Sequence, residues 1–146
     1  MKIRTVGVLG SGLMGSGIAQ VSAQAGYPTT VLEVSKDLLE KGMGRIQGFL
    51  KSGVEKGKIT AEARDRTLAL LKGTTDVKDL AECDLVIEAV TENLEAKREL
   101  FVRADKVCGK QAIFASNTSS LSITELMTAT SRPERFLGLH FFNPVP

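Results

Sequence analysis

Three glycines near the start of the chain stand in a pattern that can bind phosphate groups. They are Gly10, Gly12 and Gly15 of `GVLGSGLMGSG`, directly after a short apolar run typical of a buried strand. In this G-x-G-x-x-G spacing the first glycine permits a tight turn, the second lets the backbone approach a pyrophosphate, and the third lets a helix pack on the strand. Free N–H groups at the helix start then face the phosphates. The segment is predicted to bind a dinucleotide, with Leu13 and Met14 among its contacts.

A carboxylate follows at the position that separates one dinucleotide from another. Glu33 ends the next apolar run, 23 positions after Gly10. An acid there can accept the ribose hydroxyls of the adenosine half and repels a 2′-phosphate, so NAD is favoured over NADP. Lys36 is a weaker signal in the opposite direction. From these residues alone the alternatives are another nucleotide cofactor such as FAD, a glycine-rich turn without a ligand, or a Glu33 that merely ends a strand.

The only histidine, His140, stands near the end of the chain in `RFLGLHFFNPVP`. With an ordinary pKa of about 6.5, histidine is suited to general base catalysis. The carboxyl ends of strands bind ligands in open parallel sheets, and both 117–119 and 140–143 would lie there. Read alone, however, a histidine at a strand end is more often structural, and Ser119 and Ser120 could cap a following helix.

Short apolar runs that alternate with longer helical patterns must position these residues. Strands are expected over 4–10, 29–34, 73–75, 84–90, 112–117 and 135–141, and helices over 13–25, 35–57, 60–71, 76–83, 93–108 and 122–130. This alternation predicts an α/β fold of the Rossmann type: a doubly wound, mostly parallel sheet with helices on both faces. One domain is expected over residues 1–146.

Several helix ends and weak points can be placed by residue type. Ser35, Asn93 and Ser122 are predicted N-caps. Three glycines, Gly42, Gly44 and Gly48, fall inside the second helix. Each is expected to weaken it by about 1 kcal/mol relative to alanine.

Composition excludes several function classes. The chain has 146 residues, 42% hydrophobic and 25% charged, with a net charge of +2, as expected for a soluble globular protein. The chain has no basic face that would indicate nucleic-acid binding. It also has no apolar stretch long enough for a membrane span or a signal peptide. Cys83 and Cys108 lack metal-ligand spacing, so no metal site is predicted. They are expected to be free thiols in a reducing compartment, by default the cytoplasm.

Four segments together resemble the 3-hydroxyacyl-CoA dehydrogenases, and among them the bacterial 3-hydroxybutyryl-CoA dehydrogenases. They are `GVLGSGLMGSGIAQ`, `DLVIEAVTENLEAK`, `SNTSSLSI` and `GLHFFNPVP`, and the resemblance covers essentially the whole chain. It implies an NAD-dependent oxidoreductase of fatty acid β-oxidation. Such an enzyme interconverts (S)-3-hydroxyacyl-CoA, here of short chain length, and 3-oxoacyl-CoA by hydride transfer.

The resemblance also implies roles for single residues. His140 of `HFFNP` would be the catalytic base that takes the proton of the substrate's 3-hydroxyl. The family's spacing of 21 residues selects Ser119, rather than Ser120, as the hydroxyl that meets the substrate oxygen. Cofactor contacts are implied for Glu92, Lys97, Asn117, Ser119 and Asn143, and a coenzyme A contact for Lys56. Without the resemblance, Glu92 reads as a helix-start carboxylate and Lys97 as a solvated helical charge.

The family pattern extends further than this chain. It pairs the histidine with a glutamate 12 residues later, which would fall beyond Pro146. A helical C-terminal domain then covers the acyl-CoA and forms a homo-oligomer. The 146 residues alone are therefore expected to bind NAD but not to turn over substrate. Two alternatives stay open: a standalone NAD-binding or sensor module without catalysis, or a related dehydrogenase for another hydroxy substrate.

Overall fold

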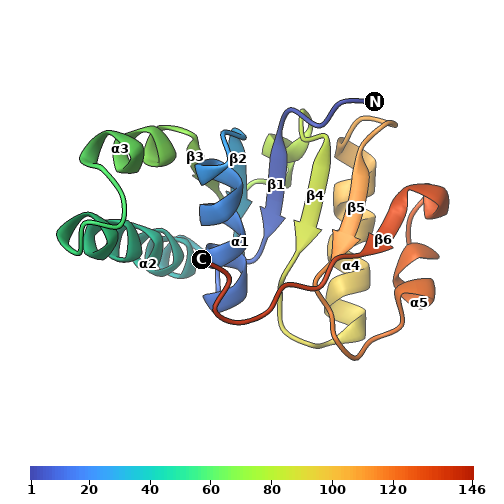
Figure 1. The fold of residues 1–146 in the computed structure, drawn as a ribbon. Helices are drawn as coiled ribbons and strands as arrows, with labels where there is room; N and C mark the ends of the chain where they lie inside the picture. Colours follow the sequence, from blue (N-terminus) through green and yellow to red (C-terminus); the bar gives the residue numbers. More distant parts are fainter.

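The computed structural model describes all residues from 1 to 146 as one parallel sheet between two layers of helices (Figure 1). Its strands are β1 Val6–Leu9, β2 Thr29–Leu32, β3 Leu71–Thr74, β4 Leu85–Glu88, β5 Ile113–Ser116 and β6 Phe136–Gly138. Neighbours pair in the order β3-β2-β1-β4-β5-β6, each pair parallel. The winding direction reverses between β1 and β4, where doubly wound sheets bind ligands. The predicted Rossmann architecture is confirmed.

All the α-helices except α1 begin at a polar side chain that caps them. They are α1 Leu13–Gln24, α2 Lys36–Glu55, α3 Ala61–Ala69, α4 Leu94–Val107 and α5 Ile123–Met127, with short 3₁₀ helices at Val77–Leu80 and Pro133–Arg135. Ser35, Asn93 and Ser122 each accept a hydrogen bond from the backbone N–H three residues on, so all three predicted caps are confirmed. The predicted helix over 76–83 is only a 3₁₀ turn. No helix is both long enough and apolar enough to cross a membrane.

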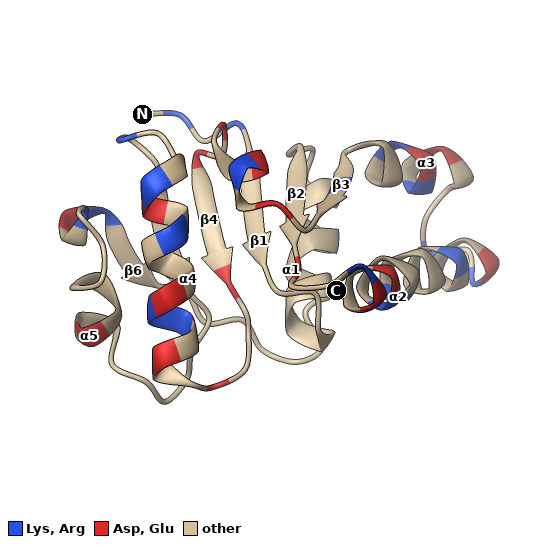
Figure 2. Ribbon diagram, turned by 180° about the vertical axis from the view of Figure 1, so that it is seen from behind, with Lys and Arg blue, Asp and Glu red and all other residues tan.

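An apolar cluster covers each face of the sheet, which is why the strands read as almost continuous hydrophobic runs. Behind the sheet of Figure 1, Phe101 of α4 packs against Phe114 and Phe136, with ring centroids 5.7 and 4.7 Å away. On the other face, Ile18 of α1 and Ile46 of α2 are buried against the strands. Figure 2 shows Lys and Arg alternating with Asp and Glu along the outer surface of α4.

The final strand is shorter than expected, because residues 139–146 leave the sheet. This segment, which we call the tail, crosses below the carboxyl ends of β5, β4 and β1 and ends beside α1 and α2 (Figure 1). A Cβ at Gly17 of α1 would lie 2.9 Å from Val145 Cβ, so only glycine allows this close packing. Phe141 and Val145 pack on the cluster that contains α1, whereas Phe142 is 77% exposed. The tail carries His140 to the ligand-binding edge of the sheet.

Candidate functional site

The loop between β1 and α1 has the shape that a pyrophosphate needs. Gly10 has φ +95°, which side chains rarely adopt. A Cβ at Gly15 would collide with the Gly10 carbonyl oxygen, while a Cβ at Gly12 would meet nothing within 4 Å. The first turn of α1 has no side-chain cap and no acidic residue. The N-terminus of α1 therefore faces open space, and its backbone amides are available to bind an anion.

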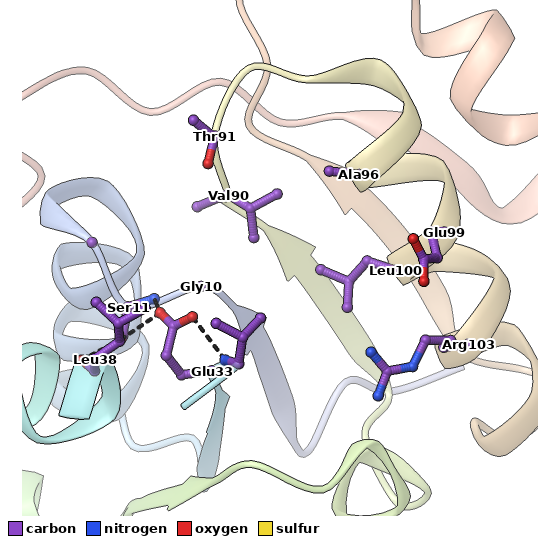
Figure 3. A pocket seen from close by; sticks show the side chains of 13 residues that line it. Gly10, Ser11, Glu33, Leu38, Val90, Thr91, Ala96, Glu99, Leu100 and Arg103 are labelled. Atoms are coloured by element: carbon purple, nitrogen blue, oxygen red, sulfur yellow. Dashed lines mark hydrogen bonds between the residues drawn. The ribbon is translucent and has the colours of Figure 1, made fainter. Parts of the chain in front are cut away.

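A cavity of about 460 Å³, here the loop cavity, lies beside these amides (Figure 3). Its lining comprises Gly10, Ser11, Gly12, Glu33, Val34, Leu38, Ala89, Val90, Thr91, Ala96, Glu99, Leu100 and Arg103. The Glu33 carboxylate accepts hydrogen bonds from Ser11 N and Ser11 Oγ, both at 2.8 Å, and from Val34 N at 2.9 Å. Glu33 is thus fixed at the end of β2, pointing to the loop, where an adenosine ribose would meet it.

The second helix approaches this loop more closely than its sequence indicated. A Cβ at Gly42 would collide with Ser11, and Arg45 Nη1 donates to the Ser11 carbonyl at 3.0 Å. Gly42 therefore has a packing role beside its cost in helix propensity. By contrast, Gly44 and Gly48 face open space. Sequence reasoning missed Ser11 and Arg45, because nothing in their spacing shows that α2 packs against the loop.

A second cavity of about 400 Å³, here the tail cavity, lies farther along the same edge. Its lining comprises Met14, Ala89, Val90, Thr91, Glu92, Lys97, Asn117, Ser119, His140, Phe141, Phe142 and Asn143. Residues 89–91 line both cavities, so one extended ligand can reach from the first to the second past the phosphate loop. The structure brings together in this cavity seven of the residues that the sequence proposed as site residues: Met14, Glu92, Lys97, Asn117, Ser119, His140 and Asn143.

Both candidate catalytic side chains face this cavity, and the tail is held in place beneath it. Asn117 Oδ1 accepts the Phe141 N–H at 2.7 Å, which fixes the backbone next to His140. The His140 ring is exposed and lies 4.9 Å from the Phe142 ring, and no carboxylate contacts it. Ser119 lines the cavity, whereas Ser120 Oγ donates to Glu92. Neither serine caps α5.

Lys97 is buried at the base of the tail cavity, so its interpretation as a solvated charge is wrong. Its side chain is 1% exposed, and Nζ lies 2.5 Å from Glu88 Oε2, 3.1 Å from Glu92 Oε1 and 3.1 Å from the Val90 carbonyl oxygen. Burial raises the pKa of Glu92, but hydrogen bonds from Thr118 and Ser120 and the Lys97 ammonium outweigh it and leave that pKa lowered. Glu88 was missed, although it is the one carboxylate within the apolar run of β4.

Three predicted site residues line neither cavity: Leu13, Lys56 and Gly15, the last of which packs closely against Gly10. Leu13 is 52% exposed and lines neither of them. Lys56 lies at the far end of α2 and, with Lys58 and Pro146, lines a separate cavity of about 360 Å³.

No group of three or more His, Cys, Asp or Glu side chains is placed to hold a metal ion. The two cysteines are buried and unpaired. Burial raises the pKa of the Cys83 thiol to about 12 and that of Cys108 to about 11, so neither is a ready nucleophile.

Known proteins are similar to this chain over nearly its whole length. Residues 5–146 match the family described as 3-hydroxyacyl-CoA dehydrogenase, NAD binding domain. A 3-hydroxybutyryl-CoA dehydrogenase of Mycobacterium tuberculosis is 51% identical over 145 residues, which are 99% of this chain and 51% of that protein. A 3-hydroxyadipyl-CoA dehydrogenase of Escherichia coli is 45% identical and is covered over 31% of its length.

Solved structures agree. The crystal structure of M. tuberculosis FadB2 superposes with a TM-score of 0.97 at 50% identity, over 100% of this chain and 52% of that one. The chain thus spans about half the length of the bacterial 3-hydroxybutyryl-CoA dehydrogenases that it matches. A Cryptosporidium parvum lactate dehydrogenase, with a TM-score of 0.69 and 17% identity, shares the fold alone.

Proposed function

The chain belongs to the 3-hydroxyacyl-CoA dehydrogenase family as its NAD-binding domain, and from that premise we propose that its protein interconverts (S)-3-hydroxyacyl-CoA and 3-oxoacyl-CoA. One observation carries the proposal: the tail cavity gathers Ser119 and His140 next to the phosphate loop. A purely structural histidine would have no reason to face a cavity together with a serine hydroxyl from another strand end.

The residues present fit NAD along the carboxyl edge of the sheet. The loop cavity would hold the adenosine half, with Glu33 at its ribose, and the N-terminus of α1 would hold the pyrophosphate. The tail cavity would hold the nicotinamide half beside Glu92, Lys97 and Asn143. When bound, the oxidised cofactor supplies the acceptor for a hydride.

Ser119 and His140 would act on the substrate's 3-hydroxyl group. An imidazole nitrogen of His140 accepts the hydroxyl proton while C3 loses its hydride, which the bound cofactor would accept, and becomes a carbonyl carbon. The Ser119 hydroxyl donates a hydrogen bond to the same oxygen and stabilises the charge that develops there. Neither role requires a metal ion.

The substrate and setting of the whole protein are also proposals. Relatives named 3-hydroxybutyryl-CoA dehydrogenase support a short acyl chain, although the E. coli relative is named for 3-hydroxyadipyl-CoA. The reaction belongs to fatty acid metabolism, as the name of a plant relative indicates for that protein. Lys56 would contact coenzyme A. We also place the protein in the cytoplasm, which two unpaired thiols suit, and expect it to form a homo-oligomer.

The test uses this chain alone and a chimera in which the C-terminal half of the M. tuberculosis relative follows Pro146. NADH formation from 3-hydroxybutyryl-CoA is measured at 340 nm. The chimera should turn over, and His140→Gln in it should lower kcat by a factor of about 10²–10⁴ with little change in NAD affinity. Full activity in the His140→Gln chimera would overturn the assignment.

A second function, an NAD-binding module without catalysis, needs only the phosphate loop and Glu33, which together line the loop cavity. An inactive chimera that still binds NAD would support the module.

A further inference from the structure

Glu88 is the most completely enclosed charged group of the molecule, and the proposed chemistry does not use it. Its side chain is 0% exposed. Oε1 accepts from Ser116 Oγ at 2.5 Å, and Oε2 accepts from Val90 N at 2.6 Å and pairs with Lys97 Nζ at 2.5 Å. A buried carboxylate with this many partners is costly to assemble, so its position calls for a physical reason.

The partners of Glu88 lead directly to the wall of the tail cavity. Val90 and Lys97 line that cavity, and Lys97 also holds Glu92, a third lining residue. The Val90 residue is held twice, because its N–H donates to Glu88 and its carbonyl accepts from Lys97. One carboxylate below the surface thus fixes three residues of the cavity wall.

We propose that Glu88 is a positioning residue, which holds Lys97, Val90 and Glu92 in place at the nicotinamide end of NAD and favours the oxidised form of the cofactor. The inference rests on the proposed function in one respect, that the tail cavity receives the nicotinamide ring. Glu88 itself does not line the cavity and touches no ligand there.

The preference for the oxidised form follows from the charge balance. Two carboxylates, Glu88 and Glu92, surround one ammonium, Lys97, so this group carries a net charge of −1. The oxidised nicotinamide ring carries a formal positive charge and the reduced ring does not. Glu88 and Lys97 are shielded from water, and Glu92 is 46% exposed, so water screens the excess negative charge only in part. The net negative group therefore stabilises the oxidised form more. Neutralising Glu88 makes the group neutral and removes that difference.

The experiment measures the Kd of three ligands, NAD⁺, NADH and ADP-ribose, by calorimetry on the 146-residue chain and its Glu88→Gln variant. ADP-ribose keeps the adenosine half, the pyrophosphate and the second ribose of NAD and lacks only the nicotinamide ring. Glutamine has the size of glutamate and can still accept from Val90 N while donating to Ser116. We expect the smallest increase in Kd for ADP-ribose, a larger one for NADH, and for NAD⁺ an increase about tenfold greater than that for NADH. A tenfold change in the ratio of NAD⁺ to NADH affinities corresponds to about 30 mV in the potential of the bound cofactor.

Ser116→Ala is the matched control, because it removes a hydrogen bond to the same carboxylate and leaves the charges intact. Its ratio of NAD⁺ to NADH affinities should equal that of the parent. Equal weakening of both redox forms by Glu88→Gln, or weakening of ADP-ribose to the same extent, would overturn the inference. Failure of the parent chain to bind NAD⁺ would instead refute the proposed function, so the two failures are distinct.

If Glu88→Gln does not fold, the double variant Glu88→Gln/Lys97→Met replaces both buried charges by neutral side chains of similar size. This double variant lacks the ammonium that pairs with Glu92 and donates to the Val90 carbonyl. Its affinity for NAD⁺ should fall several-fold, and its affinity for ADP-ribose should fall less. Parental NAD⁺ affinity in a folded double variant would contradict the role of the pair.

Discussion

The loop cavity and the tail cavity lie side by side on the same sheet edge but are built differently. The loop cavity is shaped by backbone: glycines, helix amides and a Glu33 carboxylate held by neighbouring N–H groups. The tail cavity is shaped by side chains: a buried ion pair below it, hydroxyls around Glu92, and an exposed histidine carried by the tail. A backbone-built site tolerates added side chains poorly, whereas a site built on buried charges tolerates their neutralisation poorly.

The largest loss of stability should come from Lys97→Met, which removes the buried ammonium beneath the tail cavity. It leaves the fully buried Glu88 carboxylate without its counter-charge, so the free energy of unfolding should fall by about 3–5 kcal/mol. Urea unfolding measures the loss. The control Lys51→Met alters an exposed lysine and should stay within about 0.5 kcal/mol of the parent. If Lys97→Met and Lys51→Met are equally stable, the tail cavity does not depend on the buried ion pair, and this difference between the two cavities is refuted.

Gly12→Val should act on the loop cavity alone. The valine side chain enters open space, so the apo fold should persist by circular dichroism, while the pyrophosphate position is filled. The parent should gain about 2.7 kcal/mol at 100 times the Kd of NAD, which raises its Tm by several degrees. The variant should show no shift with NAD. Gly44→Val, also facing open space but in α2, should keep the shift, and its loss there would argue against a local effect.

Glu33→Gln should weaken NAD roughly tenfold, because an amide cannot accept from all of its present donors and carries no charge for the ribose. NADP should be affected less, so the difference between the two cofactors should narrow. Calorimetry with both cofactors tests this. The control Glu99→Gln changes another carboxylate of the same cavity and should preserve the preference for NAD. Tighter binding of NADP than of NAD by the parent would refute the role of Glu33.

The smallest effect concerns pH and Glu92. The pKa of Glu92 is lowered in the folded chain from its usual value of 4.5, so its contribution to stability is complete above that value. The contribution is lost as the pH falls through the lowered pKa. Because the side chain is 46% exposed, water screens it and the contribution should stay below about 1 kcal/mol. The difference in unfolding free energy between the parent and Glu92→Gln, measured by urea unfolding, should shrink from pH 7 to pH 3. A difference that stays constant would show that it does not come from the Glu92 charge.

The elements were predictable where the pattern is local. Alternating strands and helices, three N-caps and the glycine loop follow from neighbouring residues, and the structure confirms them. The strand over 135–141 was predicted too long, because its end depends on a distant contact, the Asn117 side chain that accepts from Phe141 N. Similarly, the predicted weakness at Gly42 overlooked a close approach to Ser11, 31 positions earlier in the chain.

The sequence by itself determined the fold class, predicted the phosphate loop with Glu33, and through the family resemblance indicated Ser119 and His140 as candidate catalytic residues. Only the tertiary structure decided that Lys97 is buried, that Glu88 holds it, and that the tail crosses the sheet edge and brings His140 into the tail cavity. The physical reason is range. Backbone conformation and helix amides depend on residues a few positions apart, whereas burial of a charge depends on which helix covers which strand, and no single spacing in the chain contains that information.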